Sequence, residues 1–267
     1  MPKYRVATTL VPVSLLAVLL AAGAAFWLWA DPGFERAGGD RTDVANVPED
    51  EFDRRVRDYL MRNPQVILES VTALRDREQA EQETRAITAL DERAGEILRD
   101  PDSPVGGNPE GDVTLVEFFD YNCPYCRRVA PVVQEAVAAD GELRVVYKEF
   151  PILGANSVTA AKAALAAHRQ GRYVAFHKAM MVAKRADDDA VTDIANEIGL
   201  DLEALRRDME DPAIAAAIER NMRLALDLRI TGTPGFVVGQ DIIRGATDLG
   251  TLQGSIAKAR GSSDVEG

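Results

Sequence analysis

The chain has 267 residues, of which 46% are hydrophobic and 28% are charged, and its formal net charge at pH 7 is −12. This length allows one large domain or two smaller ones, and the hydrophobic content is ordinary for a folded globular chain. Nucleic-acid-binding proteins present a basic patch and anionic lipid attracts basic segments, so the acidic balance argues against both as partners.

The first 30 residues predict a targeting segment. Lys3 and Arg5 precede a long stretch without any charged side chain. A positive end followed by an apolar core directs a chain to export or anchors it in the membrane. Two interpretations stay open: a signal peptide cleaved near Ala22 and Ala24, or an uncleaved inner-membrane anchor, which we prefer. In both cases the rest of the chain lies outside the cytoplasm, in an oxidising compartment such as the periplasm.

A linker and a helical arm are expected next. Residues 31–47 are rich in Gly, Asp and Arg and predict the linker. Over residues 48–100 apolar side chains recur at helical spacing, and Pro64 can start a second helix there. The almost wholly polar stretch 75–85 is expected to act as a flexible strut. A narrow apolar stripe between charged flanks needs a partner helix, so the arm predicts a homo-oligomer.

The most informative stretch is a predicted buried strand, Val113–Phe119, that ends in a turn and a helix reaching about residue 138. The chain's two cysteines, Cys123 and Cys126, fall at the start of that helix. A helix N-terminus carries partial positive charge and free N–H groups, which favour the thiolate form of Cys123. The thiolate is the species that attacks disulfides. Cys126 is near enough to close a ring with Cys123 and is expected to be the more buried.

Other uses of this cysteine pair fit the sequence less well. A zinc site needs about four ligands, whereas no other cysteine exists and the two histidines, His168 and His177, are expected to be packing or surface residues. A c-type haem site needs His in place of Arg127. A four-residue disulfide ring stabilises a fold little. We therefore predict redox chemistry without metal or cofactor, although two thiolates can also hold Cu(I).

The cysteine motif resembles the active site of DsbA-like thiol–disulfide oxidoreductases, which have a thioredoxin fold. The motif reads Cys-Pro-Tyr-Cys, and Pro131 stands where the family has a kinking proline. The resemblance implies that Pro124 and Tyr125, between the cysteines, tune the redox chemistry. Glu117 stands where the family has a buried glutamate beneath the active site, which implies a role in proton handling. Lys148 has a position similar to a lysine that flanks this glutamate.

A second, separate motif strengthens the resemblance. Residues 231–235 read Thr-Gly-Thr-Pro-Gly and are similar to the cis-proline loop of the thioredoxin fold. The resemblance implies that this loop packs against the cysteines and that the Thr233 backbone, next to Pro234, pairs with an extended substrate peptide. It covers about residues 112–258 and implies an α/β fold, thioredoxin-like, with an inserted helical domain.

The remaining pattern agrees with this organisation. Residues 102–111 contain Gly and Pro and predict a boundary, so that the catalytic domain spans residues 101–267. Residues 155–228 have the pattern of successive helices, which matches the inserted domain. A hairpin is predicted over residues 236–244 and a closing helix from Asp248.

The arm also carries a resemblance. Residues 59–68 resemble the N-terminal segment of the suppressor-of-copper-sensitivity protein C group, some of whose members form trimers through it. The resemblance implies a homo-oligomer that exchanges disulfides with cysteine-containing proteins and depends on a membrane redox partner. We favour a disulfide isomerase over a monomeric disulfide-forming oxidase. A protein that binds Cu(I) is a further alternative, because the resembled group is linked to copper.

Overall fold

The computed structural model describes residues 48–263. The chain forms two compact units, and the boundary between them lies between Glu69 and Ser70. The predicted targeting segment and linker, residues 1–47, lie outside the described residues. Over residues 48–263, no helix combines the length and the apolar character that a membrane crossing requires.

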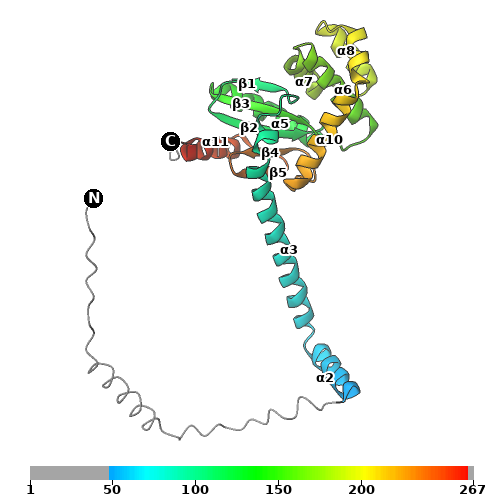
Figure 1. The fold of residues 1–267 in the computed structure, drawn as a ribbon, viewed down its shortest axis with the longest axis vertical. Helices are drawn as coiled ribbons and strands as arrows, with labels where there is room; N and C mark the ends of the chain where they lie inside the picture. The colour runs from blue at the N-terminus through cyan, green and yellow to red at the C-terminus, as the bar shows by residue number, and fades with distance from the viewer. Residues whose placement is uncertain (1–47, 264–267) are drawn as a thin grey trace, which may run out of the picture. The chain divides into compact units, whose positions relative to one another are not determined.

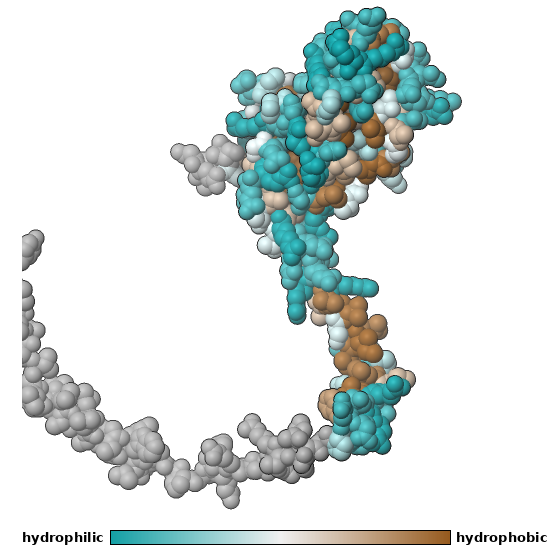
Figure 2. All heavy atoms as spheres, turned by 45° about the vertical axis from the view of Figure 1, so that its right-hand side comes forward, coloured by the Kyte–Doolittle hydropathy of each residue, from teal (hydrophilic) through white to brown (hydrophobic). Residues whose placement is uncertain are grey.

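The first unit contains α2 (Glu49–Arg62) and the beginning of α3 (Gln65–Glu92). The acidic first turn of α2 complements the partial positive charge of its N-terminus. The two helices are interrupted at Asn63 and Pro64, as predicted. No residue of α2 is buried, and Figure 2 shows apolar side chains gathered on this part of the chain. The large apolar side chains exposed in this unit are Phe52, Val56, Tyr59, Met61, Ile67 and Leu68.

The polar stretch 75–85 is helical. Helix α3 runs without interruption across it. The reason is local: the stretch consists mostly of Arg, Glu, Gln and Ala, which have high helix propensity and do not need a core contact to favour the helix.

A five-stranded sheet forms the centre of the second unit, with the strand order β1-β3-β2-β4-β5 (Figure 1). The strands are β1 (Val105–Gly107), β2 (Val113–Phe119), β3 (Leu143–Glu149), β4 (Gly235–Val238) and β5 (Asp241–Arg244). Strand β2 pairs in parallel with β3 and antiparallel with β4, so both of its edges are hydrogen-bonded. All its residues but Thr114 are buried, which is the pattern of a strand covered on both faces.

Helices cover the two faces of the sheet. On one face, α5 (Pro124–Ala139) and α11 (Leu249–Ser263) pack against the side of β2 that carries Leu115 and Phe119. On the other face, α4 (Ala94–Leu98) and the ends of α3 and α10 pack against Val116 and Phe118. The last turns of the arm therefore belong to the core of the catalytic unit.

The predicted helical insertion is confirmed. It lies between β3 and β4 in the chain and gathers to one side of the sheet (Figure 1). Asp187, Asp201 and Asp211 cap three of its helices by accepting backbone N–H groups. The insertion consists of α6 (Ala155–Arg169), α7 (Tyr173–Val182), α8 (Asp188–Glu197), α9 (Leu202–Met209) and α10 (Pro212–Asp227).

The predicted boundary over residues 102–111 contains strand β1, which the sequence did not reveal. It pairs antiparallel with β3. Its sequence, Val-Gly-Gly, has neither the length nor the alternation that identifies a strand. A side chain at Gly107 would meet the Leu143 carbonyl oxygen at 2.3 Å, and its φ of 65° also favours glycine.

Replacing Ile97 with Ala tests how strongly the end of the arm is built into the catalytic unit. Ile97 is 1% exposed against the second face of the sheet. We expect the free energy of unfolding to fall by about 2–5 kcal/mol, because the change leaves a cavity in the core. Denaturant titration measures this loss. The control, Val182→Ala, alters a side chain that is 82% exposed and should change stability by less than about 0.5 kcal/mol. Equal effects would contradict the core assignment.

Candidate functional site

The two cysteines lie where β2 leads into α5. Cys123 is the residue that precedes the helix, and Pro124 is its first residue. Proline suits this position because the first helical N–H has no partner within the helix. Both cysteines are free thiols; Cys123 is 4% exposed and Cys126 is fully buried, as expected. Burial raises the pKa of the Cys126 thiol well above its usual range.

The cis-proline loop, residues 231–235, contacts the cysteine motif, residues 123–126. The peptide bond between Thr233 and Pro234 is cis, and the Cys123 Sγ donates a hydrogen bond to the Thr233 carbonyl oxygen at 3.3 Å. The start of β4 follows directly, and Gly235 pairs with Phe118 near the end of β2. The sequence expectation that the two motifs pack together is confirmed.

Glu117 lies on the face of β2 that α5 covers. It is 1% exposed, and its Oε1 has no hydrogen-bond partner in the part of the chain that the structure describes. Burial raises its pKa from an ordinary value of 4.5 to about 8. The charge of Glu117, when present, also contributes to the raised pKa of Cys126. Glu117 is therefore mostly protonated at neutral pH, and it opposes ionisation of the buried thiol only when it is itself ionised.

Lys148 does not reach Glu117. Strand β3 pairs Tyr147 with Glu117 and Lys148 with Phe118, so alternation turns Lys148 to the opposite face of the sheet. Its ammonium group donates to the Glu96 carbonyl oxygen at 2.7 Å and to the side chains of Ser103 at 2.7 Å and Asp100 at 3.2 Å. The expected lysine partner is thus a structural anchor for the end of the arm.

The two residues between the cysteines differ in exposure. Pro124 begins α5, whereas the Tyr125 side chain is 53% exposed beside the active-site turn. The Arg128 guanidinium lies 4.7 Å from the centre of the Tyr125 ring, a distance that suits a cation–π contact. Pro131 lies inside α5, as expected.

Another buried carboxyl group, Glu149, lies at the end of β3, and the sequence did not predict it. Glu149 accepts hydrogen bonds from the hydroxyl groups of Tyr173 at 2.7 Å and Tyr121 at 3.1 Å, and burial raises its pKa well above its usual range. The His177 Nδ1 lies 3.3 Å from the Tyr121 hydroxyl, and burial lowers the pKa of His177 to about 3. His177 is a neutral packing residue, in agreement with the expectation.

Residues 114–257, more than half of the chain, match the family described as DSBA-like thioredoxin domains. The chain belongs to the DsbA-like thioredoxin-fold oxidoreductases. Residues 49–81 in addition match the family described as the copper resistance protein ScsC N-terminal domain.

Solved structures agree with this DsbA-like assignment. A thioredoxin-like oxidoreductase from Silicibacter pomeroyi is 51% identical, with a TM-score of 0.61, over 62% of this chain and 96% of that one. Proteus mirabilis ScsC in a transitional conformation is 27% identical, with a TM-score of 0.61, over 80% and 95% of the two chains.

Among curated proteins, the Na(+)/H(+) antiporter NhaA 3 of Salinispora tropica is 29% identical over 170 residues. The match covers 61% of this chain but 26% of the antiporter, so the chain spans about a quarter of the length of the curated relatives that it matches first.

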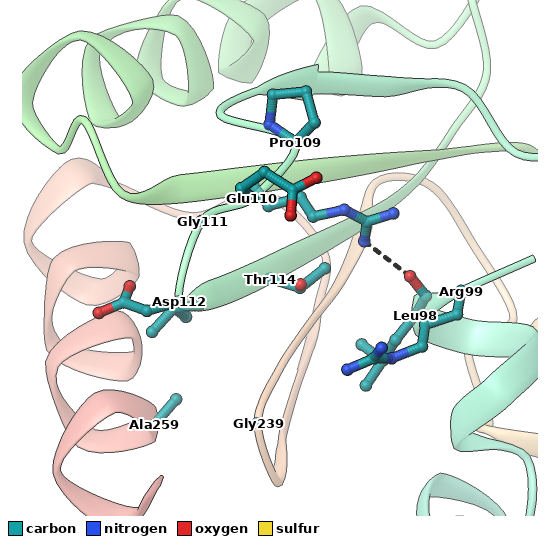
Figure 3. Close-up of a pocket in the computed structure, with 11 residues that line it drawn as sticks. Leu98, Arg99, Pro109, Glu110, Gly111, Asp112, Thr114, Gly239 and Ala259 are labelled. Carbon is teal, nitrogen blue, oxygen red and sulfur yellow. Dashed lines mark hydrogen bonds between the residues drawn. The ribbon is translucent and has the colours of Figure 1, made fainter. Parts of the chain in front are cut away.

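A polar cavity of about 510 Å³ lies at the opposite end of β2 from the cysteines of this DsbA-like domain (Figure 3). It is lined by Asp112 and Thr114 at the start of β2 and by Glu110. An Arg144 guanidinium donates across it to the Leu98 carbonyl oxygen at 2.7 Å. The redox pair follows the other end of the strand, so this cavity is separate from the candidate site.

The raised pKa of Glu117 predicts a pH-dependent stability. Between pH 4.5 and about 8 the folded state keeps a proton that the unfolded state has lost. The free energy of unfolding therefore falls as pH rises, by up to about 1.4 kcal/mol per pH unit, and levels off above the folded-state pKa. Glu117→Gln, which cannot ionise, should match the wild type below this window and exceed it above.

Denaturant titrations of both proteins across the window measure the difference, in which the contributions of all other groups cancel. Glu135→Gln alters an exposed glutamate of α5 and is the control. Parallel stability curves for the wild type and Glu117→Gln would show that Glu117 is not protonated by burial.

Proposed function

We propose that this chain is an extracytoplasmic thiol–disulfide oxidoreductase that acts on protein cysteines through Cys123 and Cys126. One observation carries the proposal: Cys123 lies at the N-terminus of α5 with its Sγ 3.3 Å from the Thr233 carbonyl oxygen, while Cys126 is buried behind it. The helix N-terminus favours the thiolate of Cys123, which is the less buried of the two cysteines. The buried cysteine is protected from substrates and is held for the second step.

Exchange proceeds in two displacements. The Cys123 thiolate attacks a substrate disulfide, forms a mixed disulfide and releases the second substrate sulfur as a thiolate. If Cys126 then attacks the Cys123 Sγ, the enzyme disulfide forms and the substrate leaves with both of its sulfurs reduced. If a substrate thiolate attacks instead, Cys123 is released unchanged and the substrate disulfide has been rearranged. The reaction that ends in the enzyme disulfide can also run in reverse, and it then oxidises a substrate dithiol while the enzyme pair is reduced.

Glu117 handles the proton of Cys126 in this proposal. Cys126 must lose its proton before it can attack, yet burial opposes its ionisation. Glu117 is buried on the same side of the sheet, has an oxygen without a partner in the described chain and has a pKa near neutrality. It therefore suits both acceptance and return of a proton at physiological pH. Pro124 and Tyr125 set the relative stability of the thiolate and the disulfide.

The backbone around Thr233 and Pro234 binds the substrate. An extended peptide can pair with the Thr233 backbone beside the end of β2, in the manner of strand addition, and this places its cysteine near Cys123. The periplasm supplies cysteine-containing proteins, and a membrane protein restores the redox state of the pair.

The domain division that we propose is a targeting segment or anchor (1–30), a linker (31–47), the arm (48–100) and the catalytic domain (101–267).

The arm favours an isomerase. Its large apolar side chains are exposed on α2 and the beginning of α3, where a second copy of the chain can cover them, and the match to the ScsC N-terminal domain supports this use. A homo-oligomer gathers several active sites around one misfolded substrate. An isomerase also needs its pair kept reduced, whereas an oxidase needs it kept oxidised. The simple oxidase is the alternative.

Cu(I) binding is a further alternative, in which the thiolates of Cys123 and Cys126 are the ligands. Within residues 48–263, no three His, Cys, Asp or Glu side chains converge in a way that could hold a metal ion. The adjacent methionines, Met180 and Met181, are buried in the core on α7 and do not add thioether ligands at the surface. Two thiolates are then the only soft ligands that the described site offers.

Cysteine variants test the proposed mechanism. Cys126→Ser should accumulate a mixed disulfide with substrate protein, because the resolving sulfur is gone, and non-reducing electrophoresis detects it. Cys123→Ser should lose nearly all disulfide reduction of insulin and form no mixed disulfide. Substantial exchange by Cys123→Ser would show that Cys123 is not the attacking cysteine.

Charged substitutions on the arm separate isomerase from oxidase without truncating the chain. Tyr59→Glu combined with Leu68→Glu puts carboxylates on the exposed apolar side chains, so the protein should become monomeric by light scattering. It should lose reactivation of scrambled ribonuclease but keep dithiol oxidation. Arg57→Glu, an exposed residue outside the apolar stripe, is the control. A monomeric wild type, or equal reactivation by the charged variant, would leave the oxidase as the function.

A further inference from the structure

The residues on either side of the cysteine motif contact the same segment of the helical insertion. Asn122 directly precedes Cys123, and Arg127 directly follows Cys126. Both side chains reach residues 181–186, at the end of α7 and in the connection to α8.

Asn122 uses both ends of its amide group. Its Nδ2 donates to the Ala186 carbonyl oxygen at 3.0 Å, and its Oδ1 accepts from the Ala186 backbone N–H at 3.1 Å. The same Nδ2 also donates to the Ser157 Oγ at 3.2 Å, on α6. Ala186 and Ser157 are buried, so these bonds replace water that would otherwise satisfy the same groups. A two-way side-chain-to-backbone contact fixes distance and orientation together.

Arg127 holds the other side of the motif. Its Nε donates to the Tyr121 carbonyl oxygen at 2.6 Å, and its Nη1 donates to the carbonyl oxygens of Ala183 and, at 3.4 Å, Met181. Its backbone N–H donates to the Cys123 carbonyl oxygen at 3.1 Å in the first turn of α5. One guanidinium therefore joins the turn before Cys123, the helix after it and the insertion. Its Nη2 is also buried, without a hydrogen-bond partner in the described chain.

We propose that Asn122 and Arg127 are positioning residues that clamp the cysteine turn to residues 181–186 of the insertion and thereby set the redox equilibrium of Cys123 and Cys126. This inference rests on the proposed exchange function and names two residues that regulate it. We call these contacts the turn clamp.

The physical argument concerns the thiolate. Stabilisation by a helix N-terminus falls off within the first turn, so the Cys123 Sγ must be held close to the free N–H groups. The turn clamp fixes the residue before Cys123 and the helix after it to the same segment of the insertion. If the clamp is removed, the turn gains freedom and the thiolate loses part of its stabilisation. Because a stabilised thiolate favours the reduced pair, loss of the clamp shifts the equilibrium toward the disulfide.

The experiment measures the equilibrium of the full-length protein with reduced and oxidised glutathione. In Asn122→Ala and, separately, Arg127→Met, the equilibrium constant for forming the enzyme disulfide should rise about fivefold, the effect of one hydrogen bond of about 1 kcal/mol. Ser157→Ala leaves Ala186 bonded to Asn122 and should produce a smaller shift. Asn196→Ala, an exposed asparagine on α8, is the matched control and should leave the equilibrium unchanged.

Amide hydrogen exchange at Ala186 provides a second readout that does not depend on redox chemistry. Its N–H should be protected in the wild type and exchange faster in Asn122→Ala, at a temperature where both proteins are folded. If the clamp variants lose thermal stability but keep the wild-type glutathione equilibrium within twofold, the clamp only stabilises the fold and the inference is wrong. If the wild type itself does not exchange disulfides with glutathione, the proposed function fails instead.

Discussion

The burial of strand β2 on both faces, with hydrogen-bonded neighbours at both edges, is the constraint on which the rest of the structure depends. Its antiparallel pairing with β4 aligns Phe118 with Gly235. Because β4 begins directly after Pro234, this register brings the cis-proline loop to the end of β2, where the cysteine turn begins. Two motifs separated by about 110 residues therefore meet through one strand pairing, and the contact between Cys123 and Thr233 spans that separation.

Glu117 on β2 and Glu149 at the end of β3 are both buried carboxyl groups, and their surroundings differ in a way that separates their roles. Glu149 accepts hydrogen bonds from two buried tyrosines, so its polar atoms are satisfied and it serves the packing of the insertion against the sheet. Glu117 has an oxygen without a partner among the described residues. An unsatisfied buried carboxyl group destabilises a fold. Glu117 also interacts electrostatically with the Cys126 thiol. We therefore assign proton handling to Glu117 and not to Glu149.

The sequence predicted the sheet's central strand, the helical insertion and the meeting of the two motifs, because each has a strong local pattern or a specific resemblance. It did not predict β1, whose three residues pair only because β3 offers a free edge. It also did not predict that α3 continues as a helix through its polar part, where helix propensity favours the helix without burial. Lys148 does not flank Glu117, because it lies on the opposite face of the sheet. Successive side chains of a strand point to opposite faces, so a shift of one position along β3 changes the face, and only the register with β2 determines it.

The site residues that sequence analysis missed share one property: their partners are backbone groups far along the chain. Asn122 and Arg127 carry no motif of their own, since an amide or a guanidinium that binds a distant carbonyl oxygen has no fixed spacing to its partner. Their contacts join the cysteine turn to the helical insertion. The Cys123 thiol donates to the Thr233 carbonyl oxygen of the cis-proline loop, a bond that ends when the thiolate forms. The contacts of Asn122 and Arg127 with the insertion do not involve the sulfur's proton, so they restrain the turn in both forms of Cys123.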